Sequence, residues 1–227
     1  MYPIIVPFLN SNKNKKKAFK LFVFWSWTVR ILGLYHVRIE KKAELPKGPL
    51  LFVGNHNSYL DIFLLYSILP KESFLFLGKS EILKYPLIKT YFKRLNIPVF
   101  RNNKRKAARS IIQALVEVRN GWSIMIFPEG GIPDENNPKM IPFKRGAFIL
   151  AKQAQIPIVP ITFLNNYFLF SDPGKFLGPA RPGTSKVTIH KVISVDTMNQ
   201  LSHQELSDHC FEIINAPMIK AYPELYE

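Results

Sequence analysis

The chain has 227 residues, of which 47% are hydrophobic and 18 are phenylalanine, so it can bury a sizeable core and is neither disordered nor low in complexity. Its single cysteine, Cys210, excludes an internal disulfide and a cysteine metal cluster. A formal net charge of +15 leaves three kinds of partner open: nucleic acid, an anionic membrane surface or a phosphorylated substrate.

The N-terminal residues 1–35 are expected to form a membrane-associating helical motif. Residues 1–9 are apolar but hold two prolines, and they lack the charged start and the cleavage site of a secretory signal. A lysine-rich stretch then leads into residues 18–35, which are mostly apolar and contain two tryptophans. This segment is slightly shorter than the ~20 apolar residues of a spanning helix and holds two charged residues. A helix that lies in the interface or dips into one leaflet is therefore favoured, and a buried core helix is the alternative.

From residue 36 onward, short β-rich runs alternate with longer helical stretches. The expected strands are His36–Glu40, Leu50–Val53, Ser73–Leu77, Ile97–Phe100, Ser123–Phe127, Ile156–Phe163 and Lys186–Val192. The expected helices are Tyr59–Leu69, Ser80–Arg94, Lys104–Asn120, Arg145–Gln155 and Ser202–Tyr222, the last broken or kinked at Pro217. The alternation predicts one α/β domain over residues 36–227, with a largely parallel central sheet flanked by helices. Residues 165–185 are rich in glycine and proline and are expected to form a long loop.

Chemically versatile residues follow three of the expected strands. His56 and Asp61 come after the second strand, Arg101 after the fourth, and Glu129 with Gly130 after the fifth. A parallel sheet brings the carboxyl ends of its strands to one edge, so these residues should meet at one cleft. A histidine can take a proton from a hydroxyl, and a nearby carboxylate can hold its tautomer and stabilise the imidazolium. A guanidinium binds phosphate through two hydrogen bonds.

Each of these residues also has a simpler explanation when it is taken alone. A histidine and an aspartate this close together often occur by chance. Arg101 opens a basic stretch of a kind that usually faces solvent, and Glu129 can be an exposed turn residue. Gly130 can do no more than shape its turn, and Pro160 in the sixth expected strand would mark an edge or a bulge.

Together and in this order, the motifs resemble the glycerolipid acyltransferase family, which includes the lysophosphatidic acid acyltransferases. The resemblance covers about residues 18–195. Its parts are Asn55-His56 with Asp61, a strand that ends in Arg101, Phe127-Pro128-Glu129-Gly130, Val159-Pro160-Ile161, and the stretch Phe143–Phe148, which is similar to the family's Phe-Lys-x-Gly-Ala-Phe.

The resemblance implies an O-acyl transfer in which His56 is the general base that takes the proton of the acceptor's hydroxyl. Asp61 would orient His56 and support its charge, as the aspartate does in a serine protease triad. The hydroxyl would then attack the thioester of an acyl-CoA or an acyl-carrier protein, with no covalent enzyme intermediate. The chain has no P-loop, no dinucleotide fingerprint and no His-Glu-x-x-His, so neither a metal nor another cofactor is expected.

The resemblance also implies how a lysophospholipid acceptor would be held. Arg101, together with Lys79, would bind the acceptor's phosphate, and Glu129 and Gly130 would help to place the acceptor. The favoured acceptor is 1-acylglycerol-3-phosphate, which would give phosphatidic acid. The enzyme would work on the membrane surface, at the cytoplasmic face of the inner membrane, and nucleic acid is not expected as a partner.

Two motifs depart from the family's pattern and keep other acceptors open. Gly131 and Ile132 stand where the third motif commonly continues with Thr-Arg, which removes one cation, and Leu95 replaces a glycine that often begins the second motif. Glycerol-3-phosphate, another lysophospholipid or a lyso-aminolipid are the alternative acceptors. An alternative of a different class is a basic, non-enzymatic module that binds nucleic acid or lipid headgroups, and its support is the net charge alone.

Overall fold

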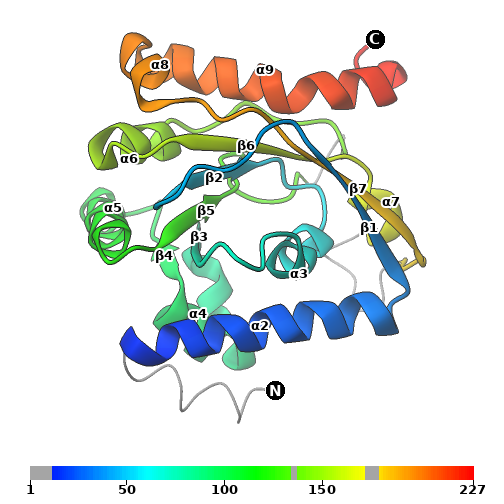
Figure 1. The fold of residues 1–227 in the computed structure, drawn as a ribbon, viewed down its shortest axis with the longest axis horizontal. Helices are drawn as coiled ribbons and strands as arrows, with labels where there is room; N and C mark the ends of the chain where they lie inside the picture. Colours follow the sequence, from blue (N-terminus) through cyan, green and yellow to red (C-terminus); the bar gives the residue numbers. More distant parts are fainter. Residues whose placement is uncertain (1–11, 134–136, 172–178) are drawn as a thin grey trace.

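A seven-stranded sheet forms the centre of the residues that the computed structural model describes, which are 12–133, 137–171 and 179–227. Its strand order is β1-β7-β6-β2-β5-β3-β4 (Figure 1). The strands are β1 (Tyr35–Lys41), β2 (Leu51–Gly54), β3 (Phe74–Lys79), β4 (Ile97–Val99), β5 (Ser123–Ile126), β6 (Ile158–Phe163) and β7 (Gly183–Ile189). Within this sheet β6 and β7 pair antiparallel, and all other neighbours pair parallel.

Helices cover both faces of the sheet. They are α2 (Asn12–Leu32), α3 (Tyr59–Ile68), η2 (Ser80–Lys84), α4 (Pro86–Leu95), α5 (Lys104–Arg119), α6 (Gly146–Ala154), α7 (Asn166–Leu169), α8 (Val195–Gln200), α9 (His203–Ala221) and η3 (Pro223–Leu225). In Figure 1, α6, α8 and α9 lie on one side of the sheet, and α2, α3 and α4 lie on the other. All residues of β2 and β6 are buried, as expected for apolar strands that are covered on both faces.

The predicted α/β class and the largely parallel sheet are confirmed, and each expected strand has its counterpart. The expected helix at residues 80–94 is divided at Tyr85, because Pro86 starts a new helix more readily than it continues one. The expected loop at 165–185 contains α7 and the start of β7, while its residues 172–178 lie outside the described part of the chain. The expectation for residues 1–9 also concerns residues outside it.

The two expectations about proline have different outcomes. Helix α9 continues across Pro217 instead of breaking there, and Ile214 and Met218 on either side of the proline are fully buried. Their burial holds the helix against the sheet although Pro217 lacks a backbone donor. Pro160 lies in β6, an interior strand. The expected edge is therefore wrong, but a bulge is present. The antiparallel pairing shifts by one residue between the Ile158–Ile193 bridge and the Ile161–Ile189 pair, and Pro160, whose carbonyl accepts from His190 N, lies between the two.

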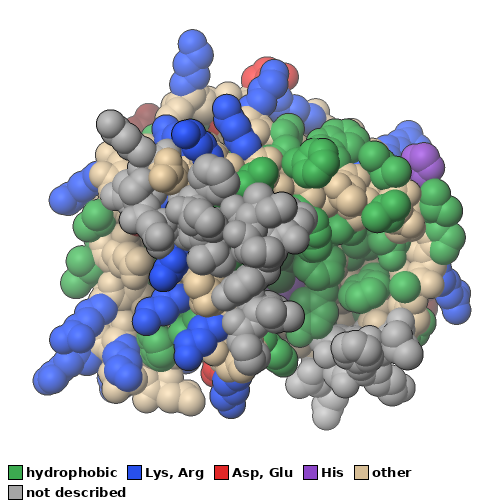
Figure 2. Space-filling view, turned by 90° about the horizontal axis from the view of Figure 1, so that it is seen from below, with side chains coloured by type: hydrophobic (Ala, Val, Ile, Leu, Met, Phe, Trp, Pro, Cys, Tyr) green, Lys and Arg blue, Asp and Glu red, His purple; other side chains and the backbone are tan. Residues whose placement is uncertain are grey.

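Helix α2 is buried along one side and exposed along the other. Phe19 and Phe22 pack on Tyr66 of α3, and the Ser26 hydroxyl donates to the carbonyl of Phe63 at 2.6 Å. Its exposed apolar residues, with one that follows the helix, are Phe24, Trp27, Ile31, Leu32 and Leu34. Figure 2 shows hydrophobic side chains gathered on one half of the molecule's lower face and many Lys and Arg side chains on the other half. No helix in the described ranges is both long and apolar enough to cross a membrane.

Candidate active site

His56 and Asp61 lie in a buried turn between the end of β2 and the first turn of α3. The Nδ1 atom of His56 is 3.0 Å from Oδ2 of Asp61, and the His56 side chain is only 9% exposed. A carboxylate accepts hydrogen bonds, so it favours the tautomer of His56 that carries its proton on Nδ1. In that tautomer Nε2 has a free lone pair, and His56 can act as a base.

The same aspartate also shapes the turn. Its Oδ2 accepts hydrogen bonds from the backbone N–H groups of Asn57 at 2.9 Å and Ser58 at 3.0 Å. The Ser58 hydroxyl accepts from Leu60 N at 3.0 Å, which completes a capping box at the start of α3. The carboxylate that faces His56 is therefore fixed by the secondary structure of the turn itself.

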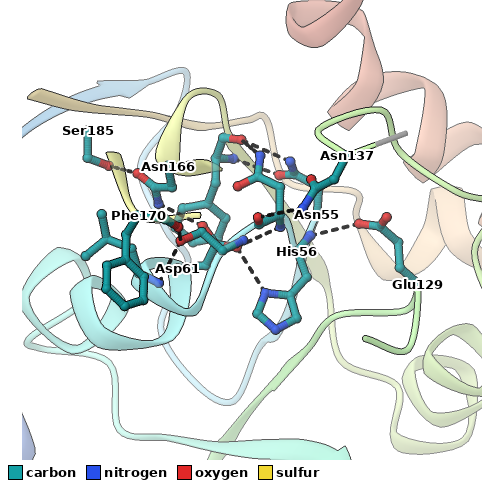
Figure 3. A network of polar contacts seen from close by, with 12 residues as sticks. Asn55, His56, Asp61, Glu129, Asn137, Asn166, Phe170 and Ser185 are labelled. Atoms are coloured by element: carbon teal, nitrogen blue, oxygen red, sulfur yellow. Dashed lines mark hydrogen bonds and ion pairs between the residues drawn. The ribbon is translucent and has the colours of Figure 1, made fainter. Parts of the chain in front are cut away.

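The end of β6 anchors the turn from a neighbouring strand. The Asn55 side-chain amide donates to the carbonyl of Phe163 at 2.9 Å, and its oxygen accepts from Phe163 N at 2.7 Å. The Asn57 amide donates to the same Phe163 carbonyl at 3.1 Å. These contacts tie the His56 turn to a strand more than 100 residues away, as Figure 3 shows around Asn55.

Glu129 contacts the backbone of His56. One oxygen of Glu129 accepts from His56 N at 2.8 Å (Figure 3), and the other accepts from Ile141 N at 3.2 Å. The side chain is 3% exposed, and burial raises the pKa of Glu129 to about 8, although the two backbone donors lower it. Nearby Asp61 raises it further. Glu129 thus holds the backbone of His56, and both its oxygens already accept hydrogen bonds from the protein.

Three cations converge on the glycine turn that follows β5. Gly130 has a φ of +96°, and a Cβ placed on it would lie 2.7 Å from Nη1 of Arg101 and 2.8 Å from Nζ of Lys144. A Cβ on Gly131 would lie 3.5 Å from Nζ of Lys79. Arg101 also donates from Nη1 to the carbonyl of Gly130. Glycine is required here because a side chain would occupy the space that the cations share.

Burial and mutual repulsion at this turn also shift the pKa values of the cations. Burial lowers the pKa of Arg101, and the nearby carboxylate of Glu81 opposes that shift. Burial and the charge of Arg101 both lower the pKa of Lys144. An anion between these side chains would relieve their repulsion, so the turn is suited to a phosphate group.

The structure brings the residues singled out by the sequence into two contacting groups. His56 pairs with Asp61, and Glu129 holds the His56 backbone. Arg101 and Lys79 flank the turn formed by Gly130 and Gly131. Sequence reasoning missed Lys144, which lies in the Phe143–Phe148 stretch and brings a third cation to the Gly130 turn. It also missed Asn166, whose side-chain amide donates to Oδ1 of Asp61 at 2.8 Å and which no sequence pattern marks.

Known proteins with similar sequences are acyltransferases. The sequence model of the Acyltransferase family matches residues 36–164. The chain is 32% identical over 222 residues to a putative 1-acyl-sn-glycerol-3-phosphate acyltransferase, acl-1, of Caenorhabditis elegans, covering 93% of this chain and 77% of that protein. It is also 32% identical over 199 residues to human 1-acyl-sn-glycerol-3-phosphate acyltransferase beta, covering 81% of this chain and 66% of the human protein.

A solved structure has the same fold. It is the crystal structure of the 1-acyl-sn-glycerophosphate (LPA) acyltransferase PlsC from Thermotoga maritima, which matches with a TM-score of 0.73 and covers 92% of this chain and 81% of that one. The two sequences are 24% identical, so this likeness supports the fold alone.

Proposed function

This chain belongs to the Acyltransferase family and is an O-acyltransferase, and we propose that it acylates the free hydroxyl of 1-acylglycerol-3-phosphate to give phosphatidic acid. The observation that carries the proposal is the buried pair of His56 and Asp61 beside a turn with three cations. The similar proteins are named 1-acyl-sn-glycerol-3-phosphate acyltransferases, which supports the same acceptor. The resemblance found in the sequence is thereby confirmed at the level of the family.

In the proposed reaction His56 takes the hydroxyl proton at Nε2 while the hydroxyl oxygen attacks the carbonyl carbon of the acyl thioester. A C–O bond forms, and the resulting tetrahedral intermediate then breaks its C–S bond. The imidazolium can return its proton to the departing thiolate. Asp61 stabilises the imidazolium and keeps Nε2 directed away from the turn, since it holds the opposite nitrogen at 3.0 Å.

Lys79, Arg101 and Lys144 are proposed to bind the acceptor's phosphate. All three lie around Gly130 and Gly131, and Glu129 of the same turn also touches the backbone of His56. A phosphate held there would leave the rest of the acceptor close to the base. Gly130 is proposed to give the phosphate access to the cations, and Glu129 to place the acceptor indirectly by holding the main chain beside it.

Membrane attachment is proposed to occur through α2 and the apolar residue that follows it. Their exposed apolar residues gather on the molecule's lower face, and the chain carries a net charge of +15 that would attract anionic lipids (Figure 2). In this account residues 1–35 are the membrane-associating motif and residues 36–227 are the catalytic domain. The enzyme would act at the cytoplasmic face of the membrane, with acyl-CoA or acyl-carrier protein as the donor.

The test is an assay of the full chain in lipid vesicles, with acyl-CoA and acyl-carrier protein as separate donors and mass spectrometry of the lipid products. The acceptor panel contains 1-acylglycerol-3-phosphate, glycerol-3-phosphate, a lysophospholipid with a zwitterionic headgroup and a lyso-aminolipid. Phosphatidic acid as the main product supports the proposal. A main product from another acceptor would replace the proposed substrate. Salt-sensitive binding to DNA without turnover would support the non-enzymatic alternative instead.

A further inference from the structure

Asp61 accepts a hydrogen bond from a residue far from its own turn. Its Oδ1 atom accepts from the side-chain amide of Asn166 at 2.8 Å, while Oδ2 serves His56 and two backbone N–H groups. The oxygen of Asn166 in turn accepts from the Ser185 hydroxyl at 2.6 Å. Asp61, Asn166 and Ser185 are each 0% exposed, and Figure 3 shows them as one chain that ends at His56.

The roles of donor and acceptor in this chain are fixed by chemistry. A carboxylate has about four acceptor positions, and here four donors reach it. Asn166 must therefore present its NH₂ group to Asp61, since its oxygen would repel the carboxylate. The Ser185 hydroxyl secures that orientation because it gives its proton to the amide oxygen. A flipped amide would lose both contacts.

The two residues come from the connection between β6 and β7 and from β7 itself. Asn166 is the first residue of α7, and Ser185 lies in β7, which pairs with β1 on one side and β6 on the other. The same connection contacts the His56 turn a second time, because the Ser58 hydroxyl donates to the carbonyl of Phe170. The β6–β7 connection thus packs against the turn through both Asn166 and Phe170.

We infer that Asn166 is a positioning residue for the pair formed by His56 and Asp61, and that Ser185 sets the orientation of Asn166. This inference rests on the proposed function. Asn166 satisfies the carboxylate oxygen that His56 does not use, which prevents Asp61 from rotating toward another donor. Asp61 is 0% exposed, so no solvent donor replaces Asn166 if this contact is lost.

The test compares Asn166→Leu, which has a similar volume but no donor, with Ser185→Ala and the double variant. Asn166→Leu should lower kcat by about 10- to 100-fold and leave KM for the acceptor within about twofold of its value. Ser185→Ala should lower kcat less, and the double variant should be no worse than Asn166→Leu, because both act through one contact on Asp61. If Asn166→Leu does not fold, Ser185→Ala decides by the same readouts.

The matched control is Thr162→Val. Thr162 is as buried as Asn166 and also makes two hydrogen bonds, but these go to Ile214 and His190. This variant should lose stability, but its kcat per folded molecule should equal that of the wild type. A kcat for Asn166→Leu or Ser185→Ala that matches that of Thr162→Val would overturn the inference.

A second readout does not depend on the reaction. The Nδ1 proton of His56, followed by NMR, should exchange faster with solvent in Asn166→Leu than in the wild type or in Thr162→Val. An unchanged exchange rate would overturn the positioning role. If the wild type acylates no acceptor of the panel, the proposed function fails, and this NMR comparison still decides whether Asn166 holds the pair.

Discussion

The imidazole of His56 lies flat against the ring of Phe127, with ring centroids 4.1 Å apart and ring planes 15° apart. Asp61 fixes one nitrogen of His56, and Phe127 fixes the plane of its ring. Phe127→Leu keeps an apolar neighbour but removes the flat surface. We expect kcat to fall by about 2- to 10-fold with little change in KM, since an aromatic pair contributes roughly 0.5–1.5 kcal/mol.

The control for this variant is Phe211→Leu, which breaks an aromatic contact with Phe143 away from the His56 turn. Steady-state kinetics on both variants check the expectation. An equal loss of kcat in the two would mean that general loosening of the fold, rather than the orientation of His56, lowers the rate.

The cations around Gly130 should control the affinity for the acceptor's phosphate. Arg101→Ala and Lys144→Ala should each raise KM for 1-acylglycerol-3-phosphate by about 10-fold or more, because a hydrogen bond to a charged group contributes roughly 1.5–3 kcal/mol. Arg105→Ala removes an exposed cation of α5 and is the control, with KM expected to stay the same. A parallel KM increase for an acceptor without phosphate would contradict this role.

Gly130→Ala should impair both stability and acceptor binding. The φ of +96° disfavours a side chain, and the new Cβ would lie within 3.0 Å of Arg101 and Lys144 atoms. We expect a loss of about 1 kcal/mol or more in the free energy of unfolding and an increase in KM similar to that of Arg101→Ala. Chemical denaturation and kinetics measure the two effects.

Gly121→Ala separates backbone strain from the loss of cation geometry. Gly121 has a similar φ of +83°, but a Cβ there would meet no atom within 4 Å. This variant should lose stability and keep the wild-type KM. If its KM rises as much as that of Gly130→Ala, the arrangement of the cations is not what Gly130 protects.

His190 should make the fold sensitive to acid. The Thr162 hydroxyl donates to the carbonyl of Ile214, so the neutral His190 donates from Nε2 to Thr162 across 2.8 Å. Burial lowers the pKa of His190 to about 4, and the charge of Lys42 lowers it further while Glu40 opposes it. The folded state therefore favours neutral His190, and its stabilisation is lost as the pH falls from about 6.5 to about 4.

The expected loss from this one group is roughly 3 kcal/mol over that pH range. His190→Gln should reduce the acid-dependent fall in the free energy of unfolding, whereas His209→Gln, an exposed change on α9, should not. Denaturation curves between pH 7 and pH 4 make the comparison. Identical pH dependence in the wild type and in His190→Gln would contradict the assignment.

Local patterns predicted most of the fold, and long-range contacts explain what they missed. An apolar run such as Leu51–Val53 identifies a buried strand, but nothing in the sequence of β7 shows that it runs antiparallel to β6. Pro217 was expected to break or kink α9, because a proline lacks the backbone donor of a helix. The helix continues because its neighbours are buried on the sheet, and the sequence does not show that tertiary packing.

The residues of the candidate site likewise fall into two groups: those that a local sequence pattern predicts and those that only the folded chain brings into the site. His56 and Asp61 lie five positions apart in one turn, so their pairing could be predicted from the sequence and is present in the structure. The contact from Asn166 to Asp61 spans 105 residues and needs the β6–β7 connection in place. Lys144 reaches the glycine turn from a nearby loop just ahead of α6, and the path of that loop is not evident from the sequence.

His56 is proposed to be the base of an acyl transfer to 1-acylglycerol-3-phosphate. The most direct measurement is kcat for phosphatidic acid formation by His56→Ala and by the wild type in the same vesicles, with circular dichroism to verify that both are folded. His56→Ala should lose activity by about 10²- to 10⁴-fold. Activity of folded His56→Ala equal to that of the wild type would contradict it.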